Sequence, residues 1–311
     1  MVITVTLNPA MDKTIVLDTL KEGSVNRVCQ ERVDAGGKGI NVSKMIRNLQ
    51  GETLATGFLG GHTGAQIRSQ LDQMGIKHEF VEVEGNTRTN IKIVDKEKCL
   101  YTDINEPGAP VSAKALKELE DSVFGPMTEN DVIVFSGSTP QNVEKSIYGK
   151  WIAIAKSKGI KAILDADGEA LREGIKAGPY MIKPNIHELE MYMERKIETT
   201  EQIIEAAQSL LKTGIEIIAV SMGEEGSVFV TRDKAFVAEA LKIDVKSTVG
   251  AGDSMVGALA YAVSKKMTLE EGIKLAVAAA AATISNEGTK MGTLEQVEYL
   301  KEQVNIKTVY C

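Results

Sequence analysis

Short apolar runs alternate with amphipathic stretches along most of this chain of 311 residues, and this alternation restricts the possible folds more than any other feature. The runs typical of buried strands are Val2–Leu7, Val132–Phe135, Lys161–Asp165, Tyr180–Lys183 and Glu216–Val220. Helical spacing is found at Gly39–Leu49, Ala65–Met74, Ala113–Phe124, Val143–Ser157 and Gln202–Lys212, and two capping boxes are predicted, at Thr199 with Gln202 and at Thr268 with Glu271. Right-handed strand–helix–strand connections build parallel sheets that are covered on both faces. We therefore expect an α/β fold with a mostly parallel sheet.

Two segments, residues 12–34 and 87–103, interrupt this alternation, because both are strand-like and neither carries a helix. We expect them to pair as a small β-sheet lid beside a core formed by residues 1–11, 35–86 and 104–311. A sheet of so few strands is marginally stable alone. Its exposed face is therefore expected to pack against a second copy of the chain, which predicts a homodimer through the lid.

Composition argues against several classes of protein. With 43% hydrophobic residues the chain can bury a large core, yet no apolar run reaches the roughly 20 residues of a membrane span. Residues 1–7 are typical of a strand and lack the basic start of a secretion signal. Cys29, Cys99 and Cys311 lie far apart, which favours reduced thiols and a cytoplasmic location. The formal charge of −7 and the lack of a basic stripe argue against nucleic-acid binding.

The segment Thr248–Met255 is the strongest indication of chemistry. Gly250, Ala251 and Gly252 lead into a run expected to be helical, so their amides can turn toward an anion at a helix N-terminus. Asp253 would repel such an anion, but it could accept a proton from a hydroxyl that attacks a bound phosphoryl group. The alternative is that Asp253 only caps the helix. This segment alone does not decide between the two.

Polar residues follow the predicted strands at their carboxyl ends, where open parallel sheets bind ligands. These polar groups begin at Asn8, Ser136, Asp165, Lys183 and Ser221. Each could be an ordinary turn, because turns favour the same residue types. Their gathering at one edge favours a binding site.

A second glycine-rich turn, at residues 35–42, leads into another predicted helix. The amides of Gly36 and Gly37, together with the donor and acceptor of Asn41, suit the hydroxyl groups of a sugar. A domain hinge is the alternative, and one segment can serve both purposes.

Arg88, Asn90 and Lys92 occupy alternate positions, so a strand would place all three side chains on one face. Such a face is usually solvated. The same three groups could equally cradle a phosphate monoester, and the pattern leaves both possibilities open.

Three common motifs are missing. The sequence contains neither a G-x-x-x-x-G-K-[ST] loop nor a G-x-S-x-G elbow. The turn after the first predicted strand has no glycine, so the dinucleotide fingerprint is absent as well. These absences disfavour P-loop enzymes, serine hydrolases and nicotinamide-dependent oxidoreductases.

Taken in order, the motifs resemble those of the PfkB (ribokinase-like) family of sugar kinases over essentially the whole chain. The matching segments are residues 36–42 and 248–254, Asn8-Pro9-Ala10 with Asp12, Lys183-Pro184-Asn185 with Glu188, and Ser221-Met222-Gly223 with Gly226. Residues 6–10, 25–27 and 87–92 resemble the phosphosugar branch, and most of all its members that act on fructose 1-phosphate. Asp165-Ala166-Asp167-Gly168 departs from the Asp-x-Ser-Gly that is usual in this branch.

This resemblance implies a three-layer α/β/α core with a small β-sheet lid, and ATP-dependent phosphorylation of fructose 1-phosphate at its C6 hydroxyl. Asp253 would be the base, and the amides of Gly250, Ala251 and Gly252 would stabilise the migrating phosphoryl group. ATP and Mg²⁺ would lie along the C-terminal half of the strand edge.

The resemblance also implies the binding residues. The sugar phosphate would contact Asp12, Arg27, Gly36, Gly37, Lys38, Asn41, Arg88, Asn90 and Ser138. The nucleotide would contact Lys183, Asn185, Ser221, Gly223, Glu224, Gly226 and Gly252. Asn185 and Glu188 would lie at the Mg²⁺ ion.

Tagatose 6-phosphate and fructose 6-phosphate are the alternative substrates, because the branch shares the base and differs in its lid contacts. A non-catalytic sugar-phosphate sensor is the alternative from another class. The acid at position 253 argues against a sensor, which has no use for a base.

Overall fold

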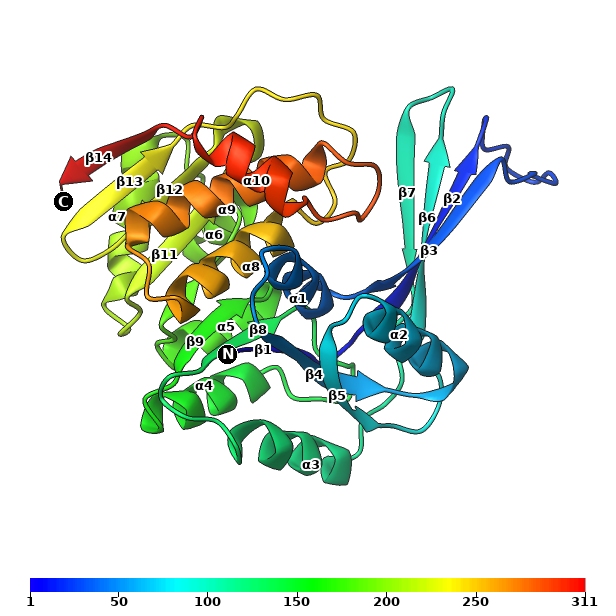
Figure 1. Ribbon diagram of the computed structural model, residues 1–311, viewed down its shortest axis with the longest axis horizontal. Helices are drawn as coiled ribbons and strands as arrows, with labels where there is room; N and C mark the ends of the chain where they lie inside the picture. The colour runs from blue at the N-terminus through cyan, green and yellow to red at the C-terminus, as the bar shows by residue number, and fades with distance from the viewer. Residues whose placement is uncertain (311) are drawn as a thin grey trace.

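The computed structural model describes residues 1–310 and places one large sheet between two layers of helices, with a second, smaller sheet beside it (Figure 1). Within these residues the large sheet has ten strands in the order β14-β13-β12-β11-β10-β9-β8-β1-β4-β5. The pairings from β11 through to β5 are all parallel. The expected α/β fold with a mostly parallel sheet is therefore confirmed.

The parallel strands are short and largely buried, as in sheets with both faces covered. They are β1 (Val2–Thr6), β4 (Thr53–Leu59), β5 (Lys77–Glu82), β8 (Val132–Ser136), β9 (Lys161–Asp165), β10 (Met181–Ile182) and β11 (Ile217–Ser221). One edge is extended by antiparallel β12 (Ser227–Val230), β13 (Lys234–Ala238) and β14 (Ile306–Tyr310).

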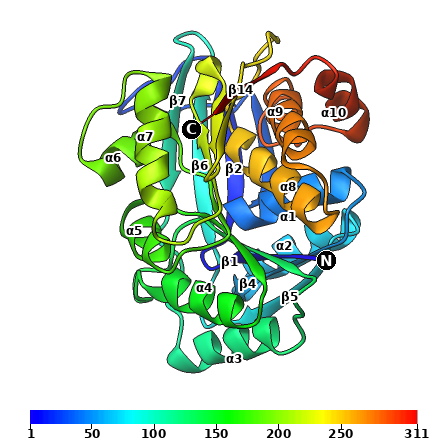
Figure 2. The same ribbon diagram turned by 90° about the vertical axis from the view of Figure 1, so that its left-hand side faces the viewer.

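The helices divide between the two faces of this sheet (Figure 2). One layer contains α3 (Ala113–Phe124), α4 (Ile147–Ser157), α5 (Gly168–Lys176), α6 (Ile186–Met193) and α7 (Thr200–Leu211). The other contains α1 (Lys38–Asn48), α2 (Gly61–Gln73), α8 (Ala251–Ser264), α9 (Leu269–Ile284) and α10 (Leu294–Lys301). Strand β8 serves both layers, because Ile133 and Phe135 pack with the first and Val132 and Val134 with the second.

The second sheet, which we call the lid, has four strands in the order β3-β2-β6-β7. They are β2 (Ala10–Leu17), β3 (Gln30–Gly36), β6 (Arg88–Asp95) and β7 (Leu100–Asn105). β2 and β6 pair in parallel at its centre, with β3 and β7 antiparallel on either side. In Figure 1 the lid projects from the core, and only its inner end adjoins the sheet edge where β1 terminates.

Some expected bounds are wrong. The helix expected from residue 143 begins at Ile147, because the chain before it turns and the amide of Val143 donates to the carbonyl of Pro140. The strand expected over residues 180–183 is reduced to Met181 and Ile182.

Of the two expected capping boxes, one forms. Thr268 and Glu271 exchange both hydrogen bonds at the start of α9. At α7 the hydroxyl of Thr199 accepts from the amide of Gln202, but the Gln202 side chain accepts from the amide of Glu198 at 2.7 Å. The reciprocal bond that defines the motif is therefore missing there.

Within residues 1–310, none of the helices has the length and apolar character to span a membrane. Cys29 and Cys99 carry free, exposed thiols. Cys311, the third cysteine of the expected reduced set, lies outside the described residues.

Candidate active site

The first turn of α8 offers a ready anion site. Gly250 is its N-cap and has a left-handed φ of 83°, a conformation that favours glycine. The helix begins at Ala251, and the amides of Ala251, Gly252 and Asp253 have no partner within the helix because they belong to its first turn. No side chain caps this end. These amides and the helix dipole can therefore attract a negatively charged group.

Asp253 is the third residue of α8 and is only 9% exposed. Its Oδ2 accepts a hydrogen bond of 2.8 Å from Nδ2 of Asn41 in α1. The alternative in which Asp253 merely caps the helix is wrong, because Gly250 occupies the cap position.

Burial raises the pKa of Asp253 to about 6. The neighbouring carboxylate of Asp165 adds to the rise, while the hydrogen bond from Asn41 and the ammonium groups of Lys38 and Lys183 oppose it. A carboxylate with this pKa is mostly ionised at neutral pH and is basic enough to take a proton from an attacking hydroxyl.

A buried cluster of opposite charges lies beside Asp253. Oδ1 of Asp165, at the end of β9, is 3.4 Å from Nζ of Lys183 and 3.8 Å from Nζ of Lys38. Burial disfavours the charge of Asp165, but the two lysines and a hydrogen bond from Ser136 outweigh it and lower the pKa of the carboxyl. Lys183 also lies against the first turn of α8, since a Cβ on Gly252 would be 3.3 Å from its Nζ. Two positive charges are thus held near the unpaired amides.

The glycine-rich turn before α1 brings the lid against the core. A Cβ on Gly36 would overlap the carboxylate of Asp12, so a larger residue here would displace that side chain. Gly37 has a φ of 110°, which also favours glycine. Oδ1 of Asp12 accepts from Nδ2 of Asn90 at 3.0 Å, and burial raises the pKa of Asp12. The turn thereby gathers a carboxyl, an amide and several backbone groups at the inner end of the lid.

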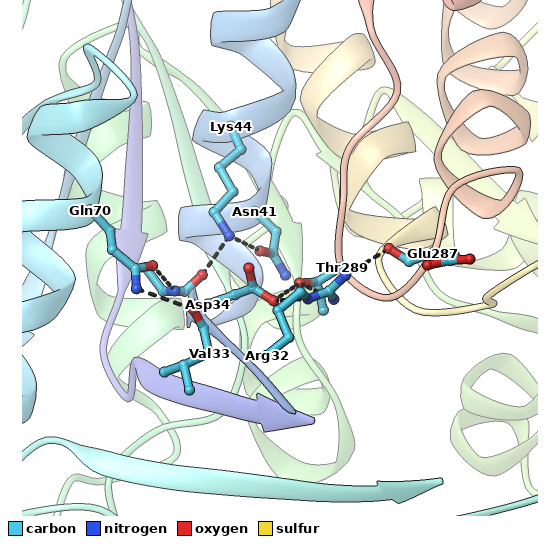
Figure 3. Close-up of polar contacts among 9 residues, drawn as sticks. Arg32, Val33, Asp34, Asn41, Lys44, Gln70, Glu287 and Thr289 are labelled. Atoms are coloured by element: carbon cyan, nitrogen blue, oxygen red, sulfur yellow. Dashed lines mark hydrogen bonds and ion pairs between the residues drawn. The ribbon is translucent and has the colours of Figure 1, made fainter. Parts of the chain in front are cut away.

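Asn41 differs from the expectation that it would bind sugar hydroxyls. Its Nδ2 donates to Asp253, and its Oδ1 accepts from Nζ of Lys44 at 3.3 Å (Figure 3). Both ends of the amide are therefore engaged within the protein. Asn41 holds the carboxylate of Asp253 in this structure.

The expected phosphate cradle on β6 is also modified. The guanidinium of Arg88 donates to the carbonyls of Asn8 at 2.9 Å, Pro9 at 3.4 Å and Glu106 at 3.1 Å. It therefore braces the segment between β1 and β2 against the segment after β7, and these bonds use three of the five N–H groups of the guanidinium. Nζ of Lys92 lies 3.4 Å from Oδ1 of Asp103 and is paired as well.

Arg27 and Ser138 lie in different parts of the structure. Arg27 is exposed in the connection between β2 and β3, and this connection lies at the outer end of the lid (Figure 1). Ser138 is half-buried and follows Gly137, whose position lies against the Lys38 side chain. Ser138 therefore belongs to the edge where Asp165 and Lys38 meet.

A cleft of about 680 Å³ lies between the lid and the core loops that precede α8 and α10, and Arg32 of β3 crosses it by donating to the carbonyl of Glu287 at 2.9 Å. Its walls include Asp12, Asn90, Lys92 and Tyr101 from the lid, and Ser247, Thr248, Val249, Gly288 and Thr289 from the core. Because Val249 directly precedes Gly250, the cleft opens beside the first turn of α8.

The residues expected to bind nucleotide and metal lie along the strand edge beyond Lys183. Asn185 caps α6, and its Oδ1 accepts from the amide of Glu188 at 2.8 Å while Oε2 of Glu188 accepts from the amide of Asn185 at 2.9 Å. Burial raises the pKa of Glu188. Ser221 forms an isolated parallel β-bridge with Asn185. The 3₁₀ helix η1 (Gly223–Glu225) follows and contains Glu224. Gly226 comes directly after η1 and has a φ of 96°. Among the described residues no three acidic, histidine or cysteine side chains converge as metal ligands.

The model of the pfkB family of carbohydrate kinases matches residues 5–296. This chain belongs to the pfkB family. It is 36% identical over 311 residues to the 1-phosphofructokinase of Borreliella burgdorferi, covering 100% of this chain and 99% of that relative. It is 34% identical over 309 residues to the 1-phosphofructokinase of Vibrio cholerae, covering 99% and 97%. Phosphofructokinase-2 from Escherichia coli, solved in complex with substrates and products, superposes with a TM-score of 0.92 at 28% identity, covering 97% and 98%.

These similarities confirm the expected ribokinase-like fold and the kinase class. The protein is thus a carbohydrate kinase of the pfkB family whose relatives act on sugar phosphates.

Two residues of this pfkB kinase were missed as site residues. Asp165 has no predicted role in the site, although an acid that ends a buried strand must find positive partners. Lys44 could have been identified from its position on the buried face of α1, because a buried lysine needs hydrogen-bond acceptors.

Proposed function

We propose that this pfkB kinase transfers the γ-phosphoryl group of ATP to the C6 hydroxyl of fructose 1-phosphate, giving fructose 1,6-bisphosphate, ADP and a proton. The observation that carries the proposal is the position of Asp253, a buried carboxylate with a pKa of about 6 in the first turn of α8. The full-length similarity to 1-phosphofructokinases supports this sugar over its isomers.

In the proposed mechanism Asp253 accepts the proton of the C6 hydroxyl as its oxygen attacks the phosphorus. The amides of Gly250, Ala251 and Gly252 receive the negative charge of the migrating phosphoryl oxygens. Lys183 and Lys38, held near this turn by Asp165, add positive charge on the same side. Phosphoryl transfer depends mainly on positioning and on charge stabilisation, so this set of groups suffices.

The nucleotide would lie along the edge formed by Lys183, Asn185 and Ser221, with Gly223, Glu224, Gly226 and Gly252 at its borders. Oε2 of Glu188 is engaged with the backbone of Asn185, which leaves Oε1 outside that pair. Mg²⁺ is usually held by one or two carboxylates together with substrate phosphates. The residues present fit this pattern, and Glu188, beside Asn185, would supply the carboxylate to an ion that neutralises the nucleotide's phosphates.

The sugar phosphate would occupy the inner end of the cleft. Asp12 and Asn90 would meet its hydroxyls, and the turn at Gly36 and Gly37 would offer backbone amides. The existing phosphate would lie near Arg88, Lys38 and Ser138, and Arg88 would donate to it through the N–H groups that bond no carbonyl. Asn41 would contribute by holding Asp253.

The proposal includes a homodimer formed through the lid. On the lid face away from Asn90 and Lys92, Ile91 lies opposite Ile104, and Ile93 lies opposite Thr102. Leu100 and Ile104 are 58% and 53% exposed. An exposed apolar face of this kind is typical of an association surface.

A cytoplasmic location is also part of the proposal, and the free thiols of Cys29 and Cys99 support it.

The test is a panel of ketohexose phosphates, each incubated with Mg-ATP, with ADP release as the rate and phosphorus NMR as the assignment of the product. We expect fructose 1-phosphate to give the highest kcat/KM and a product that carries phosphate at C1 and C6. A higher kcat/KM with tagatose 6-phosphate or fructose 6-phosphate would replace the proposed substrate. Sugar-phosphate binding with no ADP release from any member of the panel would favour a sensor.

A further inference from the structure

A chain of buried hydrogen bonds runs from the end of the lid strand β3 to Asp253, and Figure 3 shows its part around Lys44 and Asn41. Nζ of Lys44, on α1, donates both to the carbonyl of Ala35 and to Oδ1 of Asn41, and Nδ2 of Asn41 donates to Oδ2 of Asp253. Lys44 is 8% exposed and Asn41 is 5% exposed, so water has little access to these bonds.

An ammonium group determines which way the Asn41 amide faces. Lysine carries donors and no acceptor, so only Oδ1 of Asn41 can face Nζ of Lys44. The amide must then turn its Nδ2 to Asp253. If the amide were flipped, its oxygen would face the carboxylate and its nitrogen would face the ammonium, and both contacts would be unfavourable.

We propose that Lys44 is a positioning residue for phosphoryl transfer, which fixes the Asn41 amide so that Nδ2 orients the carboxylate of Asp253. This inference rests on the proposed role of Asp253 as base. Lys44 itself does not meet the substrate in this account. It acts through Asn41.

The hydrogen bond from Lys44 to the carbonyl of Ala35 connects Asp253, through Asn41 and Lys44, to the lid strand β3. Ala35 is the penultimate residue of β3, and its amide donates to Oε1 of Gln70 on α2 at 2.5 Å. Nε2 of Gln70 donates to the carbonyl of Val33 at 3.2 Å. The end of β3 is therefore held by Gln70 on one side and by Lys44 on the other, and Asp253 is oriented relative to this fixed strand end.

The test compares Lys44→Met, Asn41→Ala and the double variant with the wild type, using the sugar phosphate on which the wild type is fastest. We expect Lys44→Met to lower kcat by about 10- to 100-fold, the scale of a misplaced catalytic group, with the KM for ATP changed by less than about threefold. Because Lys44 acts through Asn41, the double variant should be no slower than Asn41→Ala alone.

Two outcomes would overturn the proposal. One is a double variant whose loss equals the product of the two single losses, since Lys44 and Asn41 would then act independently. The other is a Lys44→Met enzyme with kcat within about twofold of the wild type. A wild type without kinase activity would instead contradict the proposed function, so the two failures are distinguishable.

The controls address folding. Lys158→Met removes a lysine that also donates to a backbone carbonyl, that of Phe124, on the far layer of helices, and it should leave kcat unchanged. Unfolding midpoints of all variants show whether the protein is intact. If Lys44→Met does not fold, Lys44→Gln, which keeps a polar group but cannot reach as far, gives the same comparison with the same two contradicting outcomes.

Discussion

At the scale of the residue, Asp253 occupies a place that disfavours the charge it needs as a base. Burial raises its pKa to about 6, from an ordinary value of 3.8. For a carboxyl shifted upward, the folded protein holds the proton more tightly than the unfolded chain does. Its contribution to stability is therefore fully present below about pH 4 and is lost as the pH rises through about 6.

This shift predicts that Asp253→Asn makes the protein more stable at pH 8, by up to about 3 kcal/mol, because the neutral amide avoids the buried charge. The gain should vanish at pH 4, where the wild-type carboxyl is already protonated. Denaturant unfolding at both pH values measures it, with Asp233→Asn in the exposed β12–β13 turn as a control of small effect. An equal or lower stability of Asp253→Asn at pH 8 would contradict the account.

Individual residues differ in how well the sequence predicts them. The position of Asp253 in the first turn of a helix could be predicted because its glycines and its helix are neighbours along the chain. The contacts of Asn41 with Asp253 and of Arg88 with Asn8 could not, because these partners lie 212 and 80 residues away in the sequence and only the fold brings them together. A pattern shows that a polar group needs a partner, but it does not show which one.

At the scale of the element, the first turn of α8 depends on the conformation of one glycine. Gly250 has a φ of 83°, and a Cβ there would lie 3.0 Å from Cε of Met291 and 3.6 Å from Cγ2 of Thr283. Met291 and Thr283, which follow in the chain, therefore pack closely against this turn. A side chain at this position would be strained and would displace the amides.

We expect Gly250→Ala to lower kcat at least about tenfold and stability by about 1–2 kcal/mol, because alanine costs roughly this much in the left-handed region. Steady-state kinetics and denaturant unfolding measure the two effects. Gly23→Ala is the matched control, since Gly23 has a φ of 67° and open space around it. If both variants lose similar stability and neither loses kcat, the Gly250 turn has no special role in transfer.

The bounds of helices and strands were predicted best where the burial and length of the element agree with the spacing of its apolar residues. The strand Lys161–Asp165 and the helix Ala113–Phe124 have the expected bounds. The start of α4 was misjudged because residues 141–146 are compatible with a helix but are used in turns after Pro140. The strand β10 is short because only Met181 and Ile182 reach both neighbouring strands.

At the scale of the whole molecule, the lid leaves an apolar face without a partner among the described residues 1–310. Leu100 and Ile104 stand on the face away from the cleft, and both are more than half exposed. The alternation of Arg88, Asn90 and Lys92 along the sequence indicated one polar face and one apolar face for this strand, but it did not show which face lies toward the cleft. The division between core and lid was predicted from the two segments without helices.

We predict that the double substitution Leu100→Glu with Ile104→Glu converts a dimer into a monomer, because two buried carboxylates at the interface would be costly. Light scattering during gel filtration measures the mass. Tyr299→Glu, on the exposed face of α10, is the control and should leave the mass unchanged. A wild type that is monomeric, or a double variant that remains dimeric, would argue against association through the lid.

The central claim is that one carboxylate receives the proton of an alcohol while neighbouring amides hold the moving phosphoryl group. The most direct measurement is kcat of Asp253→Asn and of the wild type, with Mg-ATP and fructose 1-phosphate at saturation. The account predicts a rate at least about 100-fold lower for the variant, the lower range of general-base effects, with an unchanged fold by circular dichroism. A rate within about tenfold of the wild type, in a protein that is equally folded, would contradict it.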